Sequence, residues 1–298
     1  MNTAIKETKR DRIFKIFNYS ILTVAMVVVL YPLIFILSAS ISDPAAVNSG
    51  RMWLYPIDIT FEGYQRVFNN PQIWNGYKNT IFYTVLGTFI NLLVTLPAAF
   101  ALSRRGFIGR NFFMTMFVVT MFLSGGLIPS YLLVKNLGLM NTVWALVLPN
   151  AATVWHIIVC RTFFQYTIPE DLEDAAKIDG ASILHFFGKV VLPLSTPIIA
   201  VMALFYGVDH WNSYFNAMIY ISDTSKYPLQ LVLREILVLQ EMSTNVNNLD
   251  GAALQNQANI AAIMKYAVMI VATLPLIIVY PFMQRFFVQG VMIGSVKG

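Results

Sequence analysis

The chain has few residues of the kinds that build redox centres, metal sites and soluble surfaces. Its one cysteine, Cys160, excludes an intramolecular disulfide. Its three histidines, His156, His185 and His210, are scattered and lack the spacing of metal ligands. Charged residues make up only 12% of the 298 residues, whereas hydrophobic residues make up 57%. This composition excludes an ordinary soluble domain and predicts a polytopic membrane protein.

Long apolar runs dominate the chain. Six of them approach the roughly 20 residues that a helix needs to cross a bilayer. We therefore predict an all-α polytopic membrane protein with six transmembrane helices in a single transmembrane domain over residues 1–298. Two sizeable external segments are expected at about 40–77 and 212–259, the second with a helix around 228–240. The expected spans are 14–38, 78–102, 111–134, 143–164, 190–211 and 260–284.

The distribution of lysine and arginine predicts the orientation. Thirteen of the 20 fall before the first span, in the short connection near Arg104 to Arg110, around Arg161 to Lys189, or after the last span. Short loops rich in these residues remain cytoplasmic, so both termini are expected in the cytoplasm. The net charge of +5 then reflects topology and contact with anionic lipid more than affinity for nucleic acid.

An acid-rich polar island interrupts the apolar chain at about 168–190. Pro169 suits a helix start, acidic residues follow it at the positive end of the helix dipole, and Gly180 suits a stop. The pattern predicts a short helix over 169–179, a tight turn, and a second helix capped by Ser182. An amphipathic interfacial hairpin and a docking element for a cytoplasmic partner both fit this spacing.

The segment from Asp174 to Ala181, DAAKIDGA, is followed by Leu192-Pro193-Leu194-Ser195-Thr196-Pro197. Together they resemble the EAA loop of binding-protein-dependent ATP-binding-cassette (ABC) importer permeases, most closely the maltose-type carbohydrate family. The tail from Gln284 to Gly298 is also similar to that family. One departure is Asp174, which stands where the family usually has glutamate; the carboxylate is retained on a shorter stem, and docking is expected to survive.

The resemblance implies the type I ABC importer permease fold and a coupling role for the loop. It also implies a second, related permease subunit, two ATPase subunits and an extracytoplasmic solute-binding protein. ATP and magnesium are expected on the ATPase subunits, because this chain has no G-x-x-x-x-G-K-[ST] pattern. The residues expected to couple to the ATPase are Glu173, Asp174, Ala175, Ala176, Asp179, Gly180 and Ala181.

Polar groups within the spans mark a candidate substrate path, because burying them without partners is costly. The outer end of the fifth span combines aromatic faces with hydrogen-bonding groups, as a sugar ring requires. The alternative is that Asp209 and His210 only meet water at the interface. Asn91 and Arg161 are further polar groups within spans. The candidate path residues are His156, Tyr206, Asp209, His210, Trp211 and Asn212.

Our hypothesis is a permease subunit of an ATP-driven importer of a carbohydrate, expected to be an oligosaccharide, in a bacterial cell membrane. An acidic sugar is one option, because Lys135, His156 and Arg161 lie in or next to spans. The alternatives are a permease for a non-sugar solute and an ion-coupled secondary transporter, which would need carboxylates deep within spans. A membrane enzyme is disfavoured, since no nucleophile–base pair or metal cluster emerges.

Overall fold

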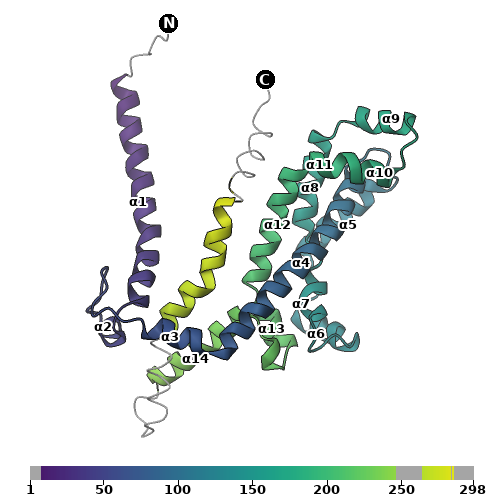
Figure 1. Ribbon diagram of the computed structural model, residues 1–298. Helices are drawn as coiled ribbons and strands as arrows, with labels where there is room; N and C mark the ends of the chain where they lie inside the picture. Colours follow the sequence, from purple (N-terminus) through teal and green to yellow (C-terminus); the bar gives the residue numbers. More distant parts are fainter. Residues whose placement is uncertain (1–7, 246–263, 283, 285–298) are drawn as a thin grey trace. The chain divides into compact units, whose positions relative to one another are not determined.

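The computed structural model describes residues 8–245, 264–282 and 284, and these residues form helices and connecting turns without a strand (Figure 1). The all-α prediction is confirmed. The chain divides into two compact units, residues 1–70 with 235–272 and residues 71–234 with 273–298. The single-domain organisation over 1–298 stays a prediction.

The first unit contains the long helix α1 (Lys9–Ser40) and the short helices α2 (Pro44–Asn48) and α3 (Glu62–Asn69). Thr8 caps α1 through a capping box with Asp11, which satisfies two otherwise unpaired N–H groups. Only the last residues of α1 are buried within this unit, so most of its apolar surface is exposed. An exposed apolar helix of 32 residues is suited to contact with lipid.

The end of α1 is fastened to the segment that follows it. The Ser40 hydroxyl lies 2.8 Å from the Tyr64 hydroxyl of α3, and Ser38 Oγ donates to the Leu54 carbonyl at 2.7 Å. Asp43 caps α2 by accepting from the Ala46 N–H. The expected external segment at 40–77 therefore begins as a folded structure.

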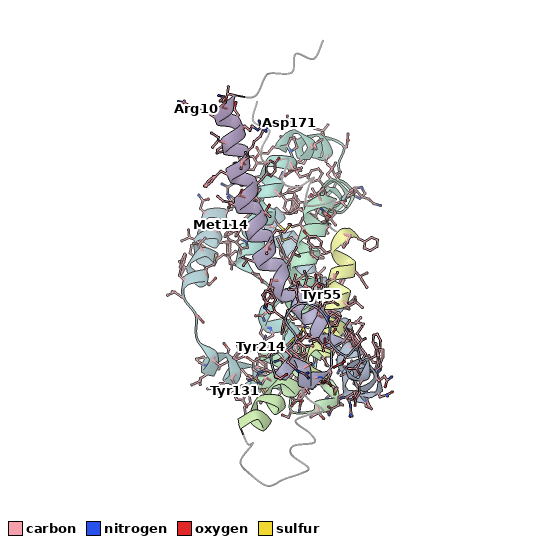
Figure 2. All side chains as sticks on the ribbon, turned by 90° about the vertical axis from the view of Figure 1, so that its left-hand side faces the viewer. Arg10, Tyr55, Met114, Tyr131, Asp171 and Tyr214 are labelled. Carbon is pink, nitrogen blue, oxygen red and sulfur yellow. The ribbon has the colours of Figure 1, made fainter. Side chains whose placement is uncertain are left out.

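The second unit is built around α4 (Pro71–Ser103), which packs mainly against α12 (Thr196–Trp211) and α8 (Val154–Thr167) (Figure 1). Their contact forms the largest apolar core of the unit, with Phe164 and Met202 fully buried. Figure 2 shows Asp171 at one end of this unit and Tyr131 and Tyr214 at the other, with Met114 between them. The remaining helices of the unit lie around this three-helix centre.

The six predicted spans are found as three continuous helices and three bent pairs. The continuous ones are α1, α4 and Met264–Phe282. If each bent pair is one span, the three pairs bring the total among the described residues to six. These pairs are α5 (Arg110–Phe122) with α6 (Leu127–Asn136), bent by 114°; 144–150 with α8, bent by 52°; and 183–194 with α12, bent by 81°.

The bends occur where glycine or proline interrupts the apolar runs. Gly126 precedes α6 with φ of +84°, a conformation that glycine adopts at little cost. Pro149 lies in the turn η1 (Leu148–Asn150), which follows α7 (Trp144–Val147), and Pro197 lies at the start of α12. A proline removes a backbone donor, so it marks a place where the helix can change direction.

At the end of the second unit that holds α6 are α13 (Phe215–Tyr220), η3 (Thr224–Lys226) and the start of α14 (Leu229–Asn245). Asn79 Nδ2 of α4 donates to the carbonyls of Ser225 and Tyr227, at 2.8 and 3.0 Å. The helix predicted at 228–240 is confirmed and extends to Asn245. Residues 246–259 of the external segment predicted at about 212–259, and the tail from Arg285 onward, lie outside the described residues.

Candidate coupling loop and polar cluster

The acid-rich island forms α9 (Glu170–Ile178), a turn, and α10 (Ile183–Phe186), which continues into η2 (Phe187–Val191) and α11 (Leu192–Leu194). The predicted short helix is confirmed, except that Pro169 is the residue before the helix and Glu170 is its first residue. The predicted turn is confirmed as well, since Gly180 has φ of +73°. Ser182 caps α10 by accepting from the His185 N–H, as predicted.

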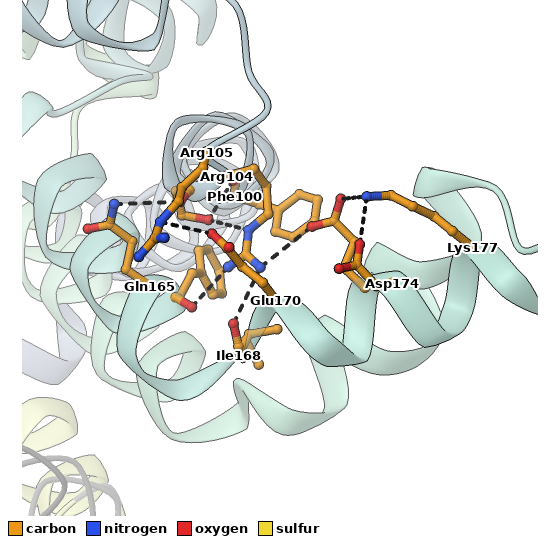
Figure 3. A network of polar contacts seen from close by, with 11 residues as sticks. Phe100, Arg104, Arg105, Gln165, Ile168, Glu170, Asp174 and Lys177 are labelled. Atoms are coloured by element: carbon orange, nitrogen blue, oxygen red, sulfur yellow. Dashed lines mark hydrogen bonds and ion pairs between the residues drawn. The ribbon is translucent and has the colours of Figure 1, made fainter.

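Arg104, in the turn after α4, holds the start of α9 (Figure 3). Its side chain is almost fully buried. Its guanidinium donates to the carbonyls of Phe164 at 3.0 Å and Ile168 at 3.3 Å, and lies 3.7 Å from a carboxylate oxygen of Glu173. It also lies over the Phe100 ring, 5.2 Å from the centroid. One side chain therefore joins the ends of α4 and α8 to the first turn of α9.

Further ion pairs surround this contact (Figure 3). Arg105 Nε lies 3.2 Å from Glu170, and Lys177 Nζ lies 2.9 Å from Glu173 and 3.3 Å from Asp174. Hydrogen bonds to the carboxylates of Glu173 and, second, Asp174 raise the pKa of Lys177 above its ordinary value. Glu173 is thus shared between a buried arginine and an exposed lysine.

The expected coupling residues divide into two sets. Glu173 faces Arg104, and Ala176 packs against the apolar core, so these two face inward. Asp174, Ala175, Asp179 and Gly180 are exposed, whereas Ala181 is half-buried and its N–H donates to the Ala176 carbonyl at 2.9 Å. The loop therefore has one face fixed to the bundle and another open to a partner.

Two features of the loop escaped the sequence analysis. The first is Arg104, whose partners lie 60 or more residues away in the chain. The second is the exposure of two large apolar side chains, Ile178 and Leu184, with 87% and 78% of their surfaces accessible. Large apolar side chains in a polar loop can be recognised in a sequence. They are a signal for an interaction site, because exposed apolar surface is unfavourable in water unless a partner covers it.

The candidate substrate-path residues do not share one environment. Tyr206 is buried in the interface of α12 with α4 and α8, where its hydroxyl lies 2.6 Å from the Thr95 hydroxyl. The His156 ring meets the Tyr206 ring edge-on at 4.4 Å between centroids, and its buried Nδ1 has no hydrogen-bond partner among the described residues. Asp209 and Asn212 are exposed.

His210 and Asn91 form the second polar contact of this interface. His210 Nε2 lies 2.7 Å from Asn91 Oδ1, while Asn91 Nδ2 donates to the carbonyls of Asn150 and Ala151 at 2.6 and 3.0 Å. The His210 ring lies directly against Gly87, where an added Cβ would overlap the ring unless the ring moved. Trp211 is buried elsewhere, with its ring 6.2 Å from that of Tyr77.

Arg161 lies away from this cluster. Its Nε donates to the Leu102 carbonyl at 3.0 Å, toward the end of the bundle that holds α9. Arg161 is therefore held by a hydrogen bond from α8 to the end of α4. The structure thus brings together Tyr206 and His156, and separately His210 and Asn91, within the contact of α4, α8 and α12.

The family model for the binding-protein-dependent transport system inner membrane component matches residues 72–293. Protein LplC of Bacillus subtilis (strain 168) is 39% identical over 291 residues, which cover 98% of this chain and 97% of LplC. The polygalacturonan/rhamnogalacturonan transport system permease protein YtcP of the same organism is 38% identical over 290 residues, which cover 97% of this chain and all of YtcP.

A solved structure shares the fold. It is a chain of a bacterial ABC transporter involved in the import of the acidic polysaccharide alginate, with a TM-score of 0.83 and 36% sequence identity. The match covers 95% of this chain and 100% of that chain. The chain is therefore similar to these proteins over nearly its whole length, in both sequence and fold, and this similarity includes the loop and the helix interface described above.

Proposed function

From the premise that this chain belongs to the family of binding-protein-dependent transport system inner membrane components, we propose that it is the permease subunit of an ATP-driven importer of an oligosaccharide. The observation that carries the proposal is the similarity, over nearly the whole chain, to the polygalacturonan/rhamnogalacturonan permease YtcP and to a chain of the alginate importer. The exposed, rigidly held α9 supplies the element that such an importer needs to receive force.

We propose that α9, the Gly180 turn and α10 dock into an ATPase subunit in the cytoplasm. The open face supports this role, because small Ala175 and Gly180 permit close approach and Asp174 offers a carboxylate to a basic residue. Ile178 and Leu184 supply apolar surface for burial. Arg104 fixes the opposite face, so a displacement of α9 is passed to α4 and α8.

The energy source is proposed to be external to this chain. Two ATPase subunits would bind ATP and magnesium, and a second related permease and an extracytoplasmic binding protein would complete the assembly. Closure of the ATPases would move α9 as a lever and shift the bundle between inward- and outward-facing states. In this scheme the chain transmits motion and performs no bond chemistry.

The orientation follows from the position of the cations. Arg104, Arg105 and Lys177 all lie at the end of the second unit that holds α9. Positive charge in short connections favours the cytoplasmic side, so this end is proposed to be cytoplasmic. Both termini are proposed to be cytoplasmic because lysine and arginine also precede the first expected span and follow the last. The protein would then be a multi-pass component of the bacterial cell membrane.

We propose an acidic oligosaccharide as the cargo, by analogy with YtcP and the alginate importer. The aromatic and hydrogen-bonding groups of α12 remain the candidate path, with Tyr206, His156 and His210 at its buried side. Asp209 and Asn212 are exposed and therefore reachable by a sugar. Neither Arg161 nor Lys135 contributes to this contact.

Reconstitution tests the proposal. The chain is co-expressed with the permease, ATPase and binding-protein genes that accompany it, purified without crosslinking, and placed in liposomes. We expect ATP-dependent uptake of an oligogalacturonate, with weaker uptake of a neutral oligosaccharide of equal length. Transport by this chain alone, driven by an ion gradient without ATP, would refute the importer function. Equal or greater preference for the neutral sugar would refute only the cargo.

A further inference from the structure

Two adjoining hollows lie beside the start of α5, on the end of the second unit that holds α9. The larger has a volume of about 460 Å³ and is lined on its polar side by Arg104, Arg105, Arg110, Gln165, Tyr166 and Glu170. The smaller, of about 270 Å³, continues past Arg105 and Arg110 to Phe107 and Phe112. Together they connect an arginine-rich recess to apolar side chains.

The charges in this recess are not balanced. Arg104 is paired with Glu173, and Arg105 is paired with Glu170, the one carboxylate that lines the larger hollow. Arg110 has no carboxylate within ion-pair distance among the described residues. Arg161 is close enough to Arg110 for the two positive charges to repel each other. A fixed positive charge therefore faces the hollow without a counter-ion.

The backbone adds to this attraction for an anion. Arg110 is the first residue of α5, and no side chain caps the N–H groups of that helix start. Uncapped N–H groups and the helix dipole both favour negative charge at this position. Gln165 and Tyr166 add side-chain donors around the larger hollow. Phosphate, with its charged acceptor oxygens, matches such a set of donors.

The location of the recess indicates which kind of molecule would bring a phosphate group to it. No residue of α5 is buried, and Phe112, which lines the smaller hollow two residues after Arg110, is 64% exposed. Ile108, just before Arg110, is 94% exposed. An arginine at the end of an exposed apolar span lies at the depth of the lipid headgroups, with hydrocarbon alongside the next turn.

We propose that this recess binds the headgroup of an anionic phospholipid, with Arg110 as the main contact to the phosphate. The acyl chains would then run along the exposed face of α5 past Phe112. Because Arg105 and Glu170 also line the larger hollow, the bound lipid would lie directly beside the start of α9.

The test measures which lipids the assembled transporter retains. The complex is reconstituted in nanodiscs made from equal amounts of phosphatidylcholine and phosphatidylglycerol, re-extracted in mild detergent, and analysed for bound lipid by mass spectrometry. We expect enrichment of phosphatidylglycerol in the wild type, reduced about five-fold in Arg110→Gln because one basic contact to an anionic surface is lost. Arg110→Lys keeps the charge and is expected to retain most of the enrichment.

The matched control is Lys135→Gln, which removes one exposed positive charge from α6, away from the recess. It should leave the enrichment unchanged. Equal enrichment in wild type and Arg110→Gln, or an equal fall in Lys135→Gln, would overturn the proposal. A parallel sample receives inorganic phosphate. If phosphate at a concentration comparable to that of the lipid displaces phosphatidylglycerol, the recess is assigned to a soluble anion. This result would likewise overturn the lipid site.

Discussion

Replacing Arg104 by methionine is expected to free the start of α9 from the helix bundle. Methionine has a similar length and keeps the apolar stem packed, but it removes the guanidinium and its bonds to Phe164, Ile168 and Glu173. Two backbone carbonyls at the end of α8 and one carboxylate then lose a charged donor. Glu173 keeps its contact with Lys177, so part of its charge stays balanced.

The size of the effect follows from burial. Removing one member of a buried ion pair costs about 3–5 kcal/mol, and the remaining Lys177 contact places this case near the lower value. A loss of about 3 kcal/mol in the local docking free energy corresponds to about 100-fold more frequent opening of α9. Lysine in Arg104→Lys keeps the charge but cannot reach three acceptors at once, so we expect α9 to open about tenfold more often than in the wild type.

Amide hydrogen exchange of the assembled transporter measures this opening directly. Exchange over residues 168–179 should accelerate in the order wild type, Arg104→Lys, Arg104→Met. The control is Arg66→Met, which removes an exposed ion pair with Glu62 in the other unit and should leave this peptide unchanged. Exchange that is the same in Arg104→Met and wild type would show that α9 is held by its other contacts.

Three further predictions, two of them with a paired comparison substitution, test the α9–α10 loop and the helix interface. Gly180→Pro cannot adopt φ of +73° and should abolish transport-coupled ATP hydrolysis while membrane insertion persists; Gly180→Ala, with open space around its new Cβ, costs about 1–2 kcal/mol and should retain part of it. Coupled hydrolysis that survives in the proline variant would exclude the coupling role. Ile178→Asp loses no packing within the described chain but should weaken ATPase binding at least about tenfold, measured by titration of the detergent-solubilised subunits; unaltered affinity would remove Ile178 from the docking surface. Gly87→Ala places a methyl group against the His210 ring and should lower stability by about 1–3 kcal/mol in thermal unfolding, whereas Gly207→Ala, in ordinary contact, should not; equal effects would contradict the close approach.

The coupling loop could be predicted from sequence because its signals are local. Acidic residues in the first turn of α9, Gly180 and Ser182 each act within a few positions along the chain. The spans could be predicted for the same reason, since length and apolar composition are read directly. The bends of 114°, 52° and 81° within three of the spans could not be predicted, because each angle depends on what packs against the break.

The contacts of the buried polar groups could not be predicted. Arg104 resembles its neighbour Arg105 in sequence, yet one is buried against α8 and the other is exposed. Tyr206 and Asp209 are three residues apart, but one faces Thr95 of α4 and the other faces outward. Which side of a nearly uniformly apolar helix faces its neighbours is decided by tertiary packing, and the periodicity of such a helix carries little information.

Asn91 limits how this bundle can deform. Its amide ties α4 to the carbonyls of Asn150 and Ala151 and to the ring of His210 on α12. Hydrocarbon cannot replace a broken hydrogen bond. Sliding of α12 by one turn along its axis would therefore leave several polar groups without partners and would move the His210 ring away from Gly87. Under the proposed function, α4, α8 and α12 would therefore move together as one block, and cargo would pass along the face of that block where Asp209 and Asn212 are exposed.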